Sequence, residues 1–282
     1  MKILLHTMAT PHLDLPGAIR QARALGLDGV EVVRQEGYRC ALSPGSSLTE
    51  ARAIGALAER LGAPVRALSP YVKAFNAAAD SARAAAVAEM TVAIAQAEAL
   101  GARRLRVLAG EEETPSLWEA SFERLVEALR GLAVLAARTG ISLDIENHPG
   151  TMADDAARTM RIWRAVDHPA LGVIYDPGNL AREGKEAFPA SLIAQSDAIR
   201  HVHVKDYVFA PDLPHGRRAV PPGEGMLGWG AIIAALSQLG YEGDLTLEYE
   251  MRWVPDELPP PEIGLAVGRD FLRRCLEGDP GR

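Results

Sequence analysis

The sequence predicts an α/β fold, namely a (β/α)8 TIM barrel in which residues 1–282 form a single domain. Strand-like and helix-like runs alternate almost from end to end, and eight strand-like runs can be counted. Alternation of this kind predicts parallel strands joined by crossover helices. The length of 282 residues also suits a closed barrel, which commonly needs about 250 residues. No G-x-G-x-x-G turn follows the first strand-like run, so an open dinucleotide-binding sheet is disfavoured.

The expected strands are short apolar runs, at residues 2–6, 29–33, 64–69, 104–109, 142–146, 172–176, 199–204 and 244–249. Between them, apolar residues at three- and four-residue spacing predict helices at 15–25, 49–61, 80–100, 116–138, 153–166 and 229–239. Several of these end at a glycine, where a left-handed cap is easiest. Three longer irregular stretches, at 36–47, 208–228 and 252–261, follow strand ends, where a barrel builds its active-site loops.

The composition limits the kinds of molecule that the protein is expected to bind. The formal net charge of -7 argues against nucleic acid, because nucleic-acid affinity rests mainly on Lys and Arg that neutralise phosphates. Cys40 and Cys275 are too few and too far apart for a disulfide framework. The N-terminus lacks the pattern of a secretory signal, and no apolar stretch approaches the roughly 20 residues of a membrane span. We therefore expect a cytoplasmic protein that binds a small molecule and neither nucleic acid nor membrane.

The ends of the fifth to eighth expected strands carry the chemistry. Their sequences are LDIENHPG (143–150), GVIYDPGNL (172–180), HVHVKD (201–206) and LTLEYE (245–250). If these strands lie side by side, one rim of the barrel receives Glu146, Asp176, His203 and Glu248. Each residue alone has an ordinary explanation in a strand end or turn, but four consecutive strands ending this way favour a site. Three carboxylates and one imidazole predict a divalent metal ion. We expect only one of His201 and His203 to face the barrel mouth.

These strings, together with PPGEGMLGW (221–229) and GYEGDLTLE (240–248), resemble the xylose isomerase-like barrels over essentially the whole chain. That family includes sugar-phosphate isomerases and epimerases, ketose 3-epimerases, hydroxypyruvate isomerase and inosose dehydratase. The resemblance implies that Glu146, Asp176, His203 and Glu248 are the metal ligands. It favours manganese (Mn²⁺), with Mg²⁺, Co²⁺ or Zn²⁺ as alternatives, which agrees with a ligand set rich in oxygen and free of thiolates. It also implies a homodimer or homotetramer.

The resemblance further implies a metal-dependent isomerase or epimerase acting on a sugar, sugar phosphate or polyol. In it, Glu146 and Glu248 flank the substrate and exchange a proton as acid and base through a metal-stabilised enediolate. Return of the proton to the opposite face of the same carbon gives epimerisation, and return to the next carbon gives isomerisation. Loss of a β-hydroxyl would instead make the protein a dehydratase of an inosose or related keto-polyol. The catalytic residues alone do not choose among these outcomes.

Further substrate-binding candidates surround the four ligands. Lys205 could stabilise an oxyanion or bind a hydroxyl, and the alternative is a solvated lysine paired with Asp206. His148 and Asn179 follow ligands closely enough to contact substrate oxygens. In ketose 3-epimerases a histidine occupies the position of Asn179, which weakens assignment to that branch. His6 and Glu224 are weaker candidates, each more simply explained as structural.

Several alternatives remain open. No Gly-rich phosphate loop is present, which favours an unphosphorylated sugar, polyol or keto-acid. Two members of the basic run at residues 103–106 are expected to face outward on a strand and form a solvated face. An apurinic-site endonuclease, which uses the same barrel, would need more histidines on the earlier strands; these end in Val33, Ser69 and Ala109, with Glu31 and Glu111 nearby. A non-catalytic sugar-binding or regulatory barrel is not excluded.

Overall fold

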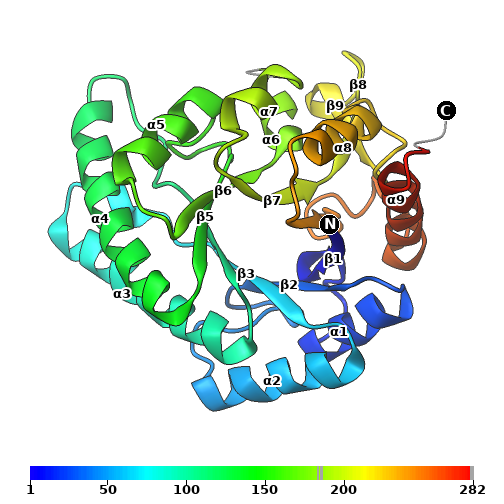
Figure 1. Ribbon diagram of the computed structural model, residues 1–282, viewed down its shortest axis with the longest axis horizontal. Coiled ribbons are helices and arrows are strands. Elements are labelled where there is room, and N and C mark those ends of the chain that lie inside the picture. The colour runs from blue at the N-terminus through cyan, green and yellow to red at the C-terminus, as the bar shows by residue number, and fades with distance from the viewer. Residues whose placement is uncertain (183, 185–186, 280–282) are drawn as a thin grey trace.

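The computed structural model describes residues 1–182, 184 and 187–279. Eight parallel strands among these residues close into a barrel in the order β1-β10-β7-β6-β5-β4-β3-β2, which confirms the predicted fold (Figure 1). The strands are β1 (Lys2–His6), β2 (Gly29–Arg34), β3 (Val65–Pro70), β4 (Arg104–Val107), β5 (Ser142–Glu146), β6 (Leu171–Tyr175), β7 (Ile199–Val204) and β10 (Asp244–Leu247). All eight overlap the expected runs.

Helices cover the outside of the barrel (Figure 1). They are α1 (Leu15–Ala24), α2 (Leu48–Leu61), α3 (Asp80–Leu100), α4 (Trp118–Thr139), α5 (Ala156–Val166), α6 (Pro177–Arg182), α7 (Ala190–Gln195), α8 (Trp229–Gln238) and α9 (Pro261–Leu276), with short 3-10 turns at η1 (Thr7–Ala9), η2 (Ala74–Asn76) and η3 (Pro214–Gly216). The six expected helices are present and end within three residues of the predicted limits. The sequence analysis missed α6, α7 and α9. Among the described residues, no helix has both the length and the apolar character needed to cross a bilayer.

Local sequence explains where α2 begins and ends and how closely it packs. At the start of α2, the Ser47 side chain accepts the backbone N–H of Glu50, and the Glu50 carboxylate accepts the backbone N–H of Ser47. Gly62 ends the same helix in the left-handed region, at φ 68°. Within α2, a Cβ added to Gly55 would lie only 2.4 Å from the carbonyl oxygen of Leu100, so glycine lets α2 pack closely against the end of α3.

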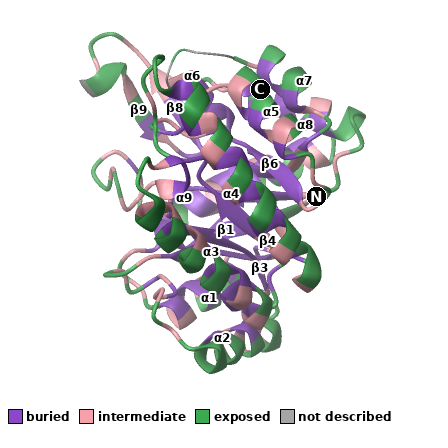
Figure 2. Ribbon diagram, turned by 90° about the vertical axis from the view of Figure 1, so that its left-hand side faces the viewer, coloured by how far each residue is buried: buried purple, intermediate pink, exposed green. Residues whose placement is uncertain are grey.

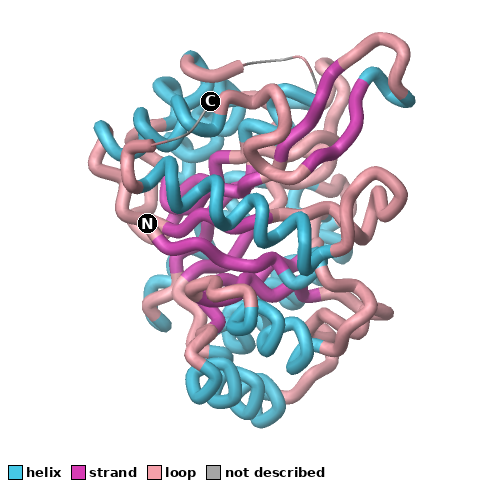
Figure 3. Tube along the Cα trace, turned by 90° about the vertical axis from the view of Figure 1, so that its right-hand side faces the viewer, coloured by secondary structure: helices cyan, strands magenta, loops and turns pink. Residues whose placement is uncertain are grey.

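The segment at 208–228, expected to be irregular, partly forms a β-hairpin. Strands β8 (Asp206–Phe209) and β9 (Arg217–Val220) pair antiparallel outside the barrel, between β7 and α8 (Figure 3). The prediction was wrong here because the prolines and glycines of the turn obscure two four-residue strands that are stable only as a pair.

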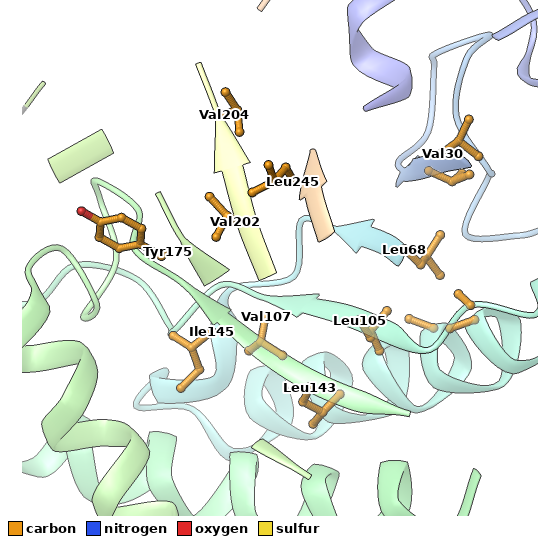
Figure 4. Packing of buried hydrophobic residues seen from close by; sticks show 14 of the residues in the cluster. Val30, Leu68, Leu105, Val107, Leu143, Ile145, Tyr175, Val202, Val204 and Leu245 are labelled. Atoms are coloured by element: carbon orange, nitrogen blue, oxygen red, sulfur yellow. The ribbon is translucent and has the colours of Figure 1, made fainter. Parts of the chain in front are cut away.

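The apolar core lies between the strands and the helices. Alternate residues of each strand face outward, among them Leu105 and Val107 of β4 and Val202 and Val204 of β7 (Figure 4). Most residues of the barrel strands are buried, whereas the outer helix surfaces are exposed (Figure 2). The remaining strand positions therefore point into the barrel, and many are polar and buried: His6, Glu31, Ser69, Arg106, Asp144, Glu146, His201, His203 and Thr246.

Candidate metal centre

Four side chains from four neighbouring strand ends meet at one rim of the barrel. Glu146 is the last residue of β5, Asp176 follows β6, His203 lies in β7 and Glu248 follows β10. Each offers one ligand atom, these atoms all lie within 4.8 Å of one another, and all four residues are buried. The strand order β10-β7-β6-β5 makes the four strands consecutive neighbours, so residues distant in sequence share one edge.

The His203 ring lies at the centre of this cluster. Its Nδ1 is 3.1 Å from Glu146 Oε1, 3.5 Å from Glu248 Oε2 and 3.9 Å from Asp176 Oδ2. The backbone N–H of Asn179 donates to Asp176 Oδ1 at 2.9 Å, so Asp176 directs its other oxygen toward the ring. One imidazole nitrogen and three carboxylate oxygens therefore converge on one small volume.

Arg106 neutralises one side of the cluster. Its Nη1 is 3.0 Å from Glu146 Oε2, its Nη2 donates to the carbonyl oxygen of Pro70 at 3.1 Å, and its guanidinium stacks 4.1 Å from the centre of the Tyr71 ring. The expectation that residues 103–106 form a solvated face is wrong for Arg106, which is 1% exposed. Because Leu105 and Val107 take the helix-facing positions of β4, Arg106 points into the barrel.

Lys205 neutralises negative charge on the other side of the cluster, beside Asp176 and Glu248. Its Nζ is 2.8 Å from Asp176 Oδ2 and 2.5 Å from Glu248 Oε2, and it is 5% exposed. The alternative of a solvated lysine paired with Asp206 is wrong. Asp206 instead accepts backbone N–H groups, from Tyr207, Gly223, Gly225 and Leu227, and so organises the loop before α8.

The three carboxylates of the cluster differ in pKa. Burial, together with the nearby Glu248 and Glu146 carboxylates, raises the pKa of Asp176 to about 7 against the opposing effect of Lys205. Burial also favours the neutral form of Glu146, but Arg106 and His203 outweigh it and lower the pKa of Glu146 to about 2. The raised pKa of Asp176 shows that the neighbouring cations do not offset the combined effect of burial and the two other carboxylates. A cluster of this composition, with hard oxygen ligands and one imidazole, fits a divalent ion such as Mn²⁺ or Mg²⁺.

A second buried group lies on the opposite side of the His203 ring. Glu31 of β2 contacts His203 Nε2 through Oε1 at 3.0 Å and His201 Nε2 through Oε2 at 2.8 Å. The expectation that only one of the two histidines faces inward is wrong, because residues two apart in a strand share one face. Glu31, His201 and His203 also satisfy the geometry of a metal-binding group. Glu31 was named only as lying near a strand end; its carboxylate interrupts an apolar strand, and this signal could have identified it.

A cavity of about 480 Å³ opens above the cluster. Of the predicted substrate-binding residues, His148, Asn179 and Lys205 line it, as does the predicted acid/base residue Glu248. Burial lowers the pKa of His148, and its Nδ1 lies 2.6 Å from the carbonyl oxygen of Pro149. The remaining residues that line the cavity are Tyr71, Lys73, Arg182, Tyr207, His215, Arg217, Ala219, Glu250, Trp253, Val254 and Glu257.

The other two candidates lie elsewhere. His6 is buried beneath the cluster, with Nε2 3.8 Å from Glu31 Oε1, and is not among the residues that line the cavity. Glu224 is exposed and lies outside the cavity. Glu146 is fully buried below the lining residues, and Asn179 Nδ2 lies 3.4 Å from its Oε1.

Comparisons with known proteins agree with this architecture. The family model for the xylose isomerase-like TIM barrel matches residues 19–275. An inosose dehydratase of Geobacillus thermodenitrificans is 27% identical over 175 residues, or 57% of each chain. A putative L-ribulose-5-phosphate 3-epimerase of Escherichia coli is 26% identical over 240 residues, or 84% of each chain. The matched region spans about half the length of several inosose dehydratases.

Solved structures share the fold at low identity. A probable 3-DHS dehydratase of Bacillus anthracis superposes with a TM-score of 0.77 at 20% identity, covering 97% of this chain and 99% of that one. A D-psicose 3-epimerase of Clostridium cellulolyticum superposes with a TM-score of 0.79 at 17% identity, covering 98% and 99%. Dehydratases and epimerases thus share this barrel.

Proposed function

The chain belongs to the family of xylose isomerase-like TIM barrels, and on that premise we propose that it is a divalent-metal-dependent isomerase or epimerase of a sugar, sugar phosphate or keto-polyol. The observation that carries the proposal is the buried cluster of three carboxylates and one imidazole below a cavity of about 480 Å³ that several charged side chains line. The matched relatives are named as enzymes that act on polyhydroxylated carbonyl compounds or their phosphates.

Glu146, Asp176, His203 and Glu248 would hold the ion, and Mn²⁺ suits the oxygen-rich set. When bound, a divalent ion supplies positive charge to a substrate carbonyl oxygen and so makes the adjacent C–H more acidic. Burial and the neighbouring carboxylates raise the pKa of Asp176 despite Lys205, and a further cation would favour its ionised form.

Glu248 would remove the proton. It lines the cavity, and its side chain is 6% exposed, so a substrate carbon can approach it. Burial opposes its ionisation, but Lys205 and His203 hold the pKa of Glu248 well below its ordinary value, which keeps it ionised at neutral pH. Glu146, which Arg106 holds in place on the other side of the cluster, would first accept a proton from a substrate hydroxyl or from water and then return it to carbon.

Lys205, His148 and Asn179 would bind the substrate oxygens. All three line the cavity beside Glu248. Lys205 offers ammonium N–H donors next to two of the carboxylates, where a substrate hydroxyl or carbonyl oxygen would lie. These contacts would fix which substrate carbon faces Glu248.

Dehydration of an inosose or related keto-polyol is the second candidate. It is favoured by the match to inosose dehydratases and by the pair of Tyr207 and Glu250 on the cavity wall. Tyr207 Oη donates to Glu250 Oε2 at 2.6 Å. In an elimination, Glu248 would take the proton next to the carbonyl, the C–O bond at the β carbon would break, and this pair would protonate the departing hydroxyl to water.

Solvent exchange tests the proposal. Full-length protein loaded with Mn²⁺ is incubated in D₂O with ketoses, ketose phosphates and inososes, and products are followed by NMR. We expect deuterium to enter one carbon of one substrate, with a new epimer, isomer or dehydrated product. Glu248→Gln should reduce the exchange rate by about 10² to 10⁴, the usual contribution of a general base.

Glu127→Gln is the matched control, because Glu127 is an exposed glutamate on α4. It should exchange at the wild-type rate. Metal-loaded protein that exchanges no substrate proton, or a Glu248→Gln variant that is as fast as the control, would contradict the proposed chemistry.

A further inference from the structure

The buried carboxylate of Glu31 has no part in the proton transfer proposed above. It lies on β2, whereas His203 lies on β7, and the two residues are 172 positions apart in sequence. Their contact crosses the barrel interior below the candidate metal centre. Both side chains are completely buried, so water cannot replace either partner in this contact.

The Glu31 carboxylate is surrounded by hydrogen-bond donors. Ser69 Oγ donates to its Oε1, which also lies 3.0 Å from His203 Nε2, and its Oε2 lies 2.8 Å from His201 Nε2. An ionised carboxylate only accepts hydrogen bonds, so each histidine nitrogen that contacts it must carry a proton.

This arrangement assigns different roles to the two nitrogens of His203. Nε2 donates to Glu31, while Nδ1 faces Glu146, Asp176 and Glu248. In the metal-free protein Nδ1 also contacts a carboxylate, Glu146 Oε1 at 3.1 Å, and so carries a proton as well. Metal binding would release that proton, and the Nε2–H held by Glu31 would leave the lone pair of Nδ1 for the ion.

We propose that Glu31 is a positioning residue for the metal centre: it accepts the Nε2–H of His203 and so holds Nδ1 as the metal-binding atom. The inference rests on the metal site proposed above. Carboxylates that accept the second N–H of a ligating histidine orient the ring and raise its basicity, and their loss typically weakens metal binding about 10- to 100-fold.

The residues around Glu31 keep it in this position. Ser69 donates from β3, the neighbour of β2. On the other side, the His201 Nε2 that contacts Glu31 also lies 2.9 Å from Thr246 Oγ1 of β10. Residues of four strands thus set the orientation of one imidazole ring, and rotation of His203 would break its buried contact with Glu31.

The test is a titration of metal-free, full-length protein with Co²⁺, which reports both affinity and coordination through its visible absorption. The wild type, Glu31→Gln and Asp244→Asn are compared. Gln keeps the shape of Glu but replaces one acceptor oxygen with an NH₂ donor and removes the negative charge. Asp244 is the matched control, since it is a buried carboxylate paired with Arg66 at 2.7 Å outside both clusters.

We expect Glu31→Gln to bind Co²⁺ about 10- to 100-fold more weakly and to give an altered absorption spectrum. Asp244→Asn should match the wild type in Co²⁺ affinity and in spectrum, even if this variant is less stable. Equal affinity and an identical spectrum for Glu31→Gln would overturn the positioning role while leaving the metal site intact. Two ions per wild-type chain, with one lost in Glu31→Gln, would overturn it as well, since Glu31 would then be a ligand.

No Co²⁺ bound by the wild type would refute the proposed metal site itself, and this result is distinguishable from the other outcomes. If Glu31→Gln does not fold, Ser69→Ala replaces it in the titration. That variant keeps the carboxylate but removes one donor to Oε1, so we expect a smaller, severalfold weakening of Co²⁺ binding. Wild-type affinity in Ser69→Ala would then count against the inference.

Discussion

Replacement of Arg106 by methionine should destabilise the metal-free protein strongly at neutral pH. Methionine keeps much of the apolar stem but removes the guanidinium that lies 3.0 Å from Glu146 Oε2. The Glu146 carboxylate is completely buried, so water cannot take over the lost contact. The variant therefore leaves a buried negative charge with one fewer cation beside it.

The structure supports a magnitude by two routes. The difference between the ordinary pKa of 4.5 and the value of about 2 for Glu146 corresponds to about 3 kcal/mol of stability. Removal of one partner from a buried ion pair typically costs about 3–5 kcal/mol. We therefore expect the free energy of unfolding to fall by about 3 kcal/mol. His203 still contacts Glu146 in the variant, and this contact limits the loss.

The pH dependence has a definite sign. Because the folded pKa of Glu146 is lowered, its contribution is present above about pH 4.5 and is lost as the pH falls toward about 2. The difference in stability between the wild type and Arg106→Met should therefore be largest near neutral pH and narrow below about pH 4.5. A difference that widens in acid would contradict the assignment of the effect to Glu146.

Urea unfolding followed by circular dichroism, with EDTA present, measures these values. Arg106→Met, Glu146→Gln and the double variant form a cycle, and we expect the double variant to be at least about 1 kcal/mol more stable than additivity predicts. Lys2→Met is the control, because Lys2 and Asp28 form an exposed pair at 3.8 Å whose loss costs at most about 1 kcal/mol. An additive cycle, or an Arg106→Met variant as stable as this control, would refute the reasoning.

Three further predictions concern packing, chemistry and the metal. Gly55→Ala should lower the free energy of unfolding by about 1–3 kcal/mol, because its Cβ would meet the carbonyl oxygen of Leu100. Gly131→Ala is the control: no atom lies near its added Cβ, so it should be neutral or stabilising in the same urea titration. Tyr207→Phe should slow release of water from a keto-polyol more than it slows solvent deuterium exchange, and equal slowing of both would count against its role as an acid. Mn²⁺ added at about 100 times its Kd should raise the free energy of unfolding by about 2.7 kcal/mol, and EDTA should reverse this; no change in the melting curve would argue against a metal site.

The properties that the sequence determined by itself are local. Alternating runs and helix-ending glycines located the eight strands and six of the helices, because periodicity and caps depend on residues a few positions apart. The four candidate ligands were found for the same reason. Each lies at the end of an apolar run, and parallel strands in consecutive order bring their ends together.

Only the tertiary structure decided which buried charges face one another. Arg106 belongs to a basic run of which two members were expected to face outward, yet its partner Glu146 lies 40 residues away on the adjacent strand. Glu31 meets His203 across 172 residues, a contact that exists only once the barrel has closed. Charge pairing in a barrel interior depends on strand order, register and closure, and the physical environment that makes these residues functional therefore arises from the assembled fold.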